Sequence, residues 1–119
     1  MMFGLFGGSA DSISGVDAVS QAKNGKLILL DVRDVMEVNQ TGKAKGALHI
    51  PMMLLRTQAD PSSPECNEKL NVATPIAVYC ATGARSGMAI RNLKKMGYQT
   101  VYNLGSLGNW ANAGGKTER

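Results

Sequence analysis

Three apolar runs, separated from one another by segments with helical spacing, place the strongest constraint on the fold of this 119-residue chain. The runs are KLILLDV at 26–32, PIAVY at 75–79 and QTVYNL at 99–104. Continuous apolar runs of this length are typical of strands buried on both faces, and strands that alternate with helices are typical of parallel sheets. The sequence therefore predicts an α/β fold in which helices cover both faces of a parallel sheet.

Residues typical of helix ends lie between these runs and predict where the helices begin and end. Ser14 suits the start of a short helix, which the Asn-Gly pair at 24–25 ends. Asp34, with Glu37 three residues later, forms a capping-box pattern, and Gly42 suits the end of that helix. Further helical segments are predicted at 52–58, 85–97 and 105–115, and a short extended segment at 47–51.

Large apolar side chains in these segments are predicted to fill the core. Met88, Leu93 and Met96 fall roughly on one face of the helix at 85–97. Tyr98 and Trp110 are assigned to packing in the core or at its rim. Because methionine is unbranched and fills irregular gaps, four methionines are assigned to the core: Met52, Met53, Met88 and Met96.

Length and composition favour one globular domain. We predict a flexible leader at 1–12, one domain at 13–114 and a tail at 115–119. The net charge is +4 and the basic residues are scattered among few aromatics, so we expect no nucleic-acid partner. The apolar start, MMFGLFGG, is too short for a membrane-spanning helix and lacks the basic beginning of a signal peptide. We therefore predict a cytoplasmic protein with no membrane partner.

Cys80 follows the second apolar run directly, before the short loop ATGA and a helix that begins near Arg85. If that loop turns the chain from strand to helix, its amides and the positive end of the helix dipole lower the pKa of the thiol. No acidic residue occurs between Glu68 and Glu118, which also favours a thiolate and attracts small anions. The alternative is a buried core cysteine that only ends a strand.

Several other polar residues are candidates for the same site. Arg85 can either bind an oxyanion or pair with Asp31 or Glu37. Asp31 ends the first apolar run, so it shares the carboxyl edge of the predicted sheet with the cysteine. The single histidine, His49, precedes an Ile-Pro pair and is assigned a structural or surface role rather than that of a general base. With one histidine and two cysteines, the chain has no predicted disulfide framework, metal site or cofactor.

Four segments, in this order and spacing, resemble a single-domain rhodanese, a sulfurtransferase, over about 13–114: LLDVRDVMEV, GALHIP, IAVYCATGARSGMAIRNLKKMGYQTVYNLGS and the tryptophan at 110. The resemblance implies one rhodanese-like domain whose parallel sheet has roughly five strands, with helices on both faces. It also implies that Cys80 takes sulfane sulfur from a small anionic donor such as thiosulfate, holds it as a persulfide and passes it to cyanide or a thiol. Asp31 and Arg33 match a DVR segment of the family and are assigned structural support. The implied anion-binding cradle consists of Ala81, Thr82, Gly83, Ala84, Arg85 and Ser86.

The resemblance leaves other functions open. A sulfur-relay module that takes a persulfide from a partner protein uses the same residues, and a regulatory binding domain keeps the fold without turnover. Arsenate reductases and phosphatases are further alternatives, but phosphatases on this fold have one residue more between the cysteine and the arginine than the four found here between Cys80 and Arg85. Sulfur transfer is therefore favoured. Cys66 is either an idle thiol or a resolving thiol for Cys80.

Overall fold

The computed structural model describes residues 11–119, so the predicted leader lies outside the described residues except for its last two positions. The structure contains the following elements in chain order: α2 (Gly15–Lys23), β1 (Ile28–Asp31), α3 (Val35–Thr41), β2 (Lys43–Ala44), β3 (Leu48–His49), η1 (Met52–Leu54), α4 (Leu55–Gln58), β4 (Ile76–Cys80), α5 (Ala84–Lys95), β5 (Val101–Ser106), α6 (Leu107–Asn112) and β6 (Thr117–Glu118). Every helix and main strand that the sequence predicts is present.

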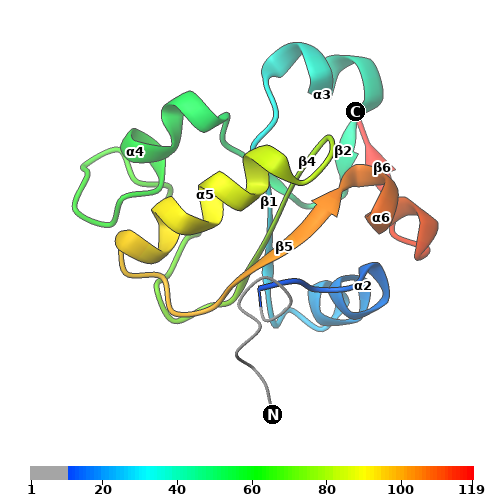
Figure 1. The fold of residues 1–119 in the computed structure, drawn as a ribbon, viewed down its shortest axis with the longest axis horizontal. Coiled ribbons are helices and arrows are strands. Elements are labelled where there is room, and N and C mark those ends of the chain that lie inside the picture. Colours follow the sequence, from blue (N-terminus) through cyan, green and yellow to red (C-terminus); the bar gives the residue numbers. More distant parts are fainter. Residues whose placement is uncertain (1–10) are drawn as a thin grey trace.

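The main sheet is parallel throughout, with the strand order β3-β1-β4-β5 (Figure 1). This arrangement confirms the predicted α/β class. The sheet has four strands within the described residues rather than the five expected, and a single parallel bridge between Ser12 and Asn103 lies beside β5. The residues predicted as a tail include β6, which pairs antiparallel with β2.

Helices cover both faces of the sheet, and each face has its own buried cluster (Figure 1). On one face α4 and α5 pack through Leu55, Ile90 and Leu93. On the other face α2 and α6 pack through Ala18 and Trp110. No helix within residues 11–119 is long and apolar enough to span a bilayer.

The predicted helix ends are confirmed by their hydrogen bonds. At the start of α2, the Ser14 hydroxyl accepts from the Asp17 amide at 3.0 Å. At the start of α3, the Asp34 carboxylate accepts from the Glu37 amide at 2.9 Å, and the Asp34 amide donates to the Glu37 carboxylate at 3.1 Å. These reciprocal bonds form the capping box, which makes the path of the chain after β1 well determined.

The assignment of the methionines to the core is only half right. Met52 and Met96 are partly buried against the core, but the side chain of Met53 is 86% exposed and that of Met88 is 52% exposed. Helix α5 turns Ser86 and Leu93 toward the sheet, and Met88 lies two positions from Ser86, which is about 200° around the helix. The prediction for Tyr98 and Trp110 is confirmed, because both are buried, and the list of buried residues on α5 is Ser86, Ala89, Ile90 and Leu93.

Candidate active site

The sulfur of Cys80 lies at the carboxyl edge of the sheet, because Cys80 is the last residue of a central strand. The cysteine is 1% exposed. Only three residues separate it from α5, and the chain makes this tight turn through Gly83, which has a φ of 102° at the helix N-cap. A residue with a side chain adopts that backbone conformation only with strain, so the turn requires glycine.

Hydrogen-bond donors of the loop converge on this sulfur. The Gly83 amide lies 3.0 Å from Cys80 Sγ and the Ser86 amide lies 3.4 Å from it. Burial by itself raises the pKa of the Cys80 thiol, but hydrogen bonds from the Ser86 side chain and from the amides of Ser86, Gly83 and Thr82 outweigh burial and hold that pKa below its ordinary value. The site therefore favours a thiolate.

The predicted cradle residues contribute unequally. The amides of Thr82, Gly83 and Ser86 reach the sulfur. Within the described part of the chain, the amides of Ala81, Ala84 and Arg85 make no hydrogen bond to it. Amides of three of the six cradle residues therefore contact the bare sulfur, and the binding of an anion by the whole loop stays a prediction.

Asn103, on β5, holds the cradle in place, although it was not predicted as a site residue. Its side-chain amide donates to the Gly83 carbonyl at 3.2 Å, and its side-chain oxygen accepts from the Ser86 hydroxyl at 2.7 Å. The same Ser86 Oγ lies 3.6 Å from Cys80 Sγ, so Asn103 also positions the hydroxyl that contacts the sulfur. A polar residue inside the third apolar run was the signal that could have identified it.

The side chain of Arg85 pairs with Glu37 of α3 rather than with Asp31. Its two terminal nitrogens lie 2.6 and 2.8 Å from the two Glu37 carboxylate oxygens. The hydrogen bonds from Arg85 lower the pKa of Glu37 to about 2, and those to Glu37 raise the pKa of Arg85. Glu37 therefore neutralises much of the charge of Arg85, and a negative charge on the Cys80 sulfur is stabilised mainly by the hydrogen bonds of the cradle.

Asp31 and Arg33 form a buried ion pair beside the site. Arg33 Nη2 lies 2.7 Å from Asp31 Oδ2, with side-chain exposures of 4% and 0%. The same guanidinium donates to Thr41 Oγ1 at 2.7 Å and to the Gly42 carbonyl at 2.6 Å, and it lies over the ring of Tyr79, 5.6 Å from the centroid. Burial lowers the pKa of Arg33, but its contacts with Asp31 outweigh burial and raise it. These contacts join the ends of β1, α3 and β4.

The arrangement of strand, cysteine loop and helix is accompanied by a match in sequence. A family model described as Rhodanese-like domain matches residues 16–113. The chain belongs to the rhodanese-like domain family.

Curated relatives of this rhodanese-like domain include thiosulfate sulfurtransferases. Thiosulfate sulfurtransferase PspE of Escherichia coli is 35% identical over 78 residues, which are 66% of this chain and 68% of PspE. Thiosulfate sulfurtransferase GlpE of Coxiella burnetii is 30% identical over 99 residues, 82% of this chain and 84% of GlpE. The putative sulfur carrier protein YrkF of Bacillus subtilis is 34% identical over 92 residues, 75% of this chain, but the match spans only 44% of YrkF.

Solved structures share the fold. Human single-domain sulfurtransferase TSTD1 is 25% identical, with a TM-score of 0.74, and the match covers 86% of this chain and 96% of TSTD1. A protein from Rhodopseudomonas palustris described as a possible tyrosine phosphatase is 29% identical, with a TM-score of 0.79, over 91% of this chain and 84% of that one. The fold therefore accommodates more than one proposed chemistry, and the details of the cysteine loop have to distinguish them.

The remaining candidate residues of the rhodanese-like domain lie around or away from the cradle. His49 Nε2 lies 2.7 Å from the Arg33 carbonyl, which fits its structural assignment. Cys66 lines a groove with Tyr98, beyond the C-terminal end of α5, whereas Cys80 lies at the other end of that helix, about 18 Å away by its length. This separation argues against a resolving role for Cys66. Within the described residues, no cluster of His, Cys, Asp or Glu suits a metal ion.

Proposed function

We propose that this domain is a sulfurtransferase that carries sulfane sulfur as a persulfide on Cys80. The observation that carries the proposal is the convergence of the Gly83 and Ser86 amides on a buried sulfur whose pKa is lowered. Such a cradle stabilises the thiolate that attacks and the negative charge of the persulfide that forms. The proposal places the reaction in the cytoplasm, where thiols stay reduced.

The reaction takes place in two displacement steps. In the first, the Cys80 thiolate attacks the outer sulfur of thiosulfate, the S–S bond of thiosulfate breaks, and sulfite leaves with the bonding electron pair. In the second, cyanide or a thiolate attacks the outer sulfur of the Cys80 persulfide, and the Cys80 thiolate leaves. Charge balances in both steps, and neither needs a general base once Cys80 is a thiolate.

Phosphate or arsenate chemistry is less well supported by the same contacts. Those reactions need a cation on the oxyanion and a carboxylic acid for the leaving group. Arg85 is occupied by Glu37, and Asp31 is occupied by Arg33. Both Glu37 and Asp31 are thus engaged in ion pairs, and only four residues lie between Cys80 and Arg85.

The test is intact-protein mass spectrometry after incubation with thiosulfate. We expect wild type and Cys66→Ser to gain one sulfur atom and Cys80→Ser to gain none. Cyanide should remove the gained sulfur and release thiocyanate. Retention of the gain in Cys80→Ser would refute the assignment of Cys80, and hydrolysis of an aryl phosphate by wild type would favour the phosphatase alternative.

A further inference from the structure

Exposed large apolar side chains gather around the edge of the sheet that holds Cys80. Six such side chains are exposed among the described residues, and one of them, Val16, lies on α2. The other five are called here the apolar rim: Val35, Met36, Met53, Leu54 and Met88. Clustering of exposed apolar residues on one part of a surface is typical of an interaction site, whereas single exposed apolar residues are normal.

The topology brings the apolar rim together. Its members lie at the start of α3, in η1 and in the first half of α5, which follow β1, β3 and β4. These strands are neighbours, so their carboxyl ends lie within about 10 Å. The ion pair between Glu37 and Arg85 brings α3 beside α5. Met36 is next to Glu37 in the chain, and Met88 follows Arg85 by three residues, so this pair places the two methionines near each other. The Met52 amide donates to the Val32 carbonyl at 3.2 Å, which holds η1 against the end of β1.

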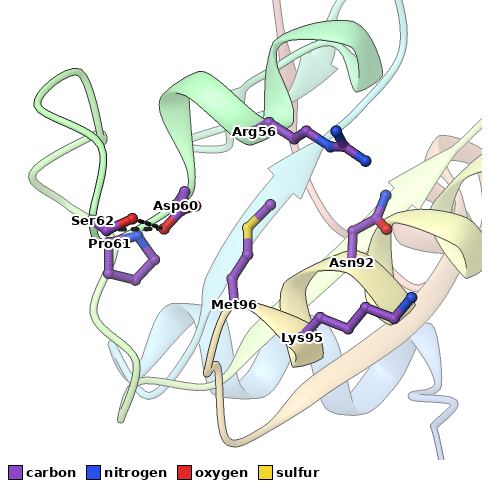
Figure 2. A pocket seen from close by; sticks show the side chains of 7 residues that line it. All are labelled: Arg56, Asp60, Pro61, Ser62, Asn92, Lys95 and Met96. Atoms are coloured by element: carbon purple, nitrogen blue, oxygen red, sulfur yellow. Dashed lines mark hydrogen bonds between the residues drawn. The ribbon is translucent and has the colours of Figure 1, made fainter.

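A basic groove continues the apolar rim along α5. Met88, Asn92 and Lys95 are spaced so that they share one face of this helix. Arg56 of α4 lines a groove of about 540 Å³ together with Asn92 and Lys95 of α5, and Figure 2 shows the Asn92 side chain directed toward Arg56. Neither Arg56 nor Lys95 forms an ion pair with any described residue.

The one acidic side chain of the basic groove, Asp60, forms no ion pair with Arg56 or Lys95. The Asp60 carboxylate accepts from the Ser62 amide at 2.9 Å and from its hydroxyl at 2.8 Å (Figure 2). The two cations outnumber this single carboxylate, so the groove keeps a net positive charge that attracts an acidic ligand. Asn92 lies six residues beyond Ser86, which is about 9 Å along the helix and too far for thiosulfate held in the cradle to reach.

We propose that the apolar rim and the basic groove dock an acidic protein that presents a cysteine persulfide on a projecting segment. This inference rests on the proposed function and names the sulfur donor for the same site. The segment must project because Cys80 Sγ lies at the bottom of the cradle, 1% exposed. Methionine side chains suit such a surface because they adapt to varied apolar partners.

The transfer itself is a thiol–persulfide exchange. The Cys80 thiolate attacks the outer sulfur of the partner's persulfide, a new S–S bond forms on Cys80, and the partner's S–S bond breaks. The partner's cysteine leaves as a thiolate with the bonding pair, so no external oxidant or reductant is needed. The reverse reaction also balances in atoms and electrons, so the docked protein also fits the role of an acceptor that takes sulfur from the Cys80 persulfide.

The test compares two short synthetic peptides, each with one cysteine persulfide flanked by leucines and either by glutamates or by lysines. We expect the acidic peptide to load Cys80 of wild type about tenfold faster than the basic peptide at low salt. The double variant Arg56→Glu/Lys95→Glu should invert this order. The double variant Met53→Ser/Met88→Ser should slow loading by both peptides several-fold. Loading by thiosulfate should stay unchanged in both variants, because it depends on the cradle alone.

Two control variants separate docking from general charge or apolar effects. Lys23→Glu reverses an exposed charge on α2, which packs on the opposite face of the sheet from α5, and Val16→Ser removes an exposed apolar residue of the same helix; we expect both to behave as wild type. Equal loading by the two peptides, or an inverted order in Lys23→Glu as well, would overturn the proposal. A wild-type dimer that becomes monomeric in Met53→Ser/Met88→Ser would also overturn it, since the apolar rim would then bind a second copy of this chain.

Direct binding makes the test independent of the chemistry. An acidic peptide with serine in place of cysteine should shift the amide NMR signals of the apolar rim and of Arg56 and Lys95, and absence of shifts there would refute docking. If neither thiosulfate nor a peptide loads Cys80 while these shifts occur, the proposed function fails and the docking surface stands. If thiosulfate loads Cys80 but no shift is seen and the peptides do not differ, the proposed function stands and docking fails.

Discussion

Removal of the Arg33 guanidinium should destabilise the domain severely. In Arg33→Met the Asp31 carboxylate, 0% exposed, loses its bonds from Arg33 Nε at 3.1 Å and Nη2 at 2.7 Å, and keeps the Arg33 amide at 2.9 Å. An uncompensated buried charge costs about 3–5 kcal/mol, out of a total of about 5–15 kcal/mol for a domain of this kind. The variant should thus lose a large share of its free energy of unfolding.

The double variant Asp31→Leu/Arg33→Met removes both charges and should recover most of the loss, to within about 2 kcal/mol of wild type. Urea unfolding followed by the fluorescence of Trp110, the single tryptophan, measures both variants. A cost below about 1 kcal/mol for Arg33→Met, as for an exposed pair, would refute the reasoning. A double variant whose loss in free energy of unfolding equals the summed losses of the single variants Asp31→Leu and Arg33→Met would also refute it.

The same double variant separates a structural role from a catalytic one. If Asp31 and Arg33 only support the ends of the strands, the folded double variant should still gain one sulfur from thiosulfate. A double variant that folds, but whose Cys80 no longer accepts sulfur, would show that the pair takes part in the chemistry.

Three further variants test the cradle and its surroundings. Ser86→Ala removes the largest hydrogen bond that lowers the Cys80 pKa, so the midpoint of the pH profile of Cys80 alkylation should rise; an unchanged midpoint would contradict this. Gly83→Ala, at a φ of 102°, should lower the free energy of unfolding in urea by about 1–3 kcal/mol and slow the loading of Cys80 by thiosulfate. A variant as stable and as active as wild type would contradict the requirement for glycine in this turn. The pKa of Glu37 is depressed from 4.5 to about 2, so its ion pair with Arg85 stabilises the fold fully above pH 4.5 and loses this effect as the pH falls toward 2. In Glu37→Gln the free energy of unfolding should therefore fall less between pH 4.5 and 2 than in wild type, by about 0.2–1 kcal/mol. The same loss of stability with falling pH in both proteins would contradict the pairing.

Local signals made most of the fold predictable. The capping box of Asp34 and Glu37 and the continuous apolar strands depend on neighbouring residues, so the sequence shows them directly. The pairing of β2 with β6 was not predictable, because a strand of two residues has no periodicity to detect. The exposure of Met53 and Met88 was not predicted because an apolar side chain is buried only where another element covers it, and the hydrophobicity of a residue does not show whether it is covered.

The candidate site was also predictable only where it depends on residues close together in the chain. The position of Cys80 and the turn at Gly83 follow from their place between a strand and a helix. The choice of Glu37 over Asp31 as the partner of Arg85 depends on how α3 packs beside α5, which sequence spacing leaves open. Asn103 was missed because its role arises from the pairing of β4 with β5, between residues far apart in the chain.

The depth at which Cys80 lies has a practical consequence for chemical labelling. Both thiols are free, but Cys66 is half-buried on a loop surface and Cys80 is 1% exposed. A bulky maleimide dye should therefore react first at Cys66, whereas a small reagent such as iodoacetamide or hydrogen peroxide can reach both thiols. The size of the reagent thus selects the cysteine, and a fluorophore can be placed on the wild-type protein while Cys80 stays free to carry sulfur.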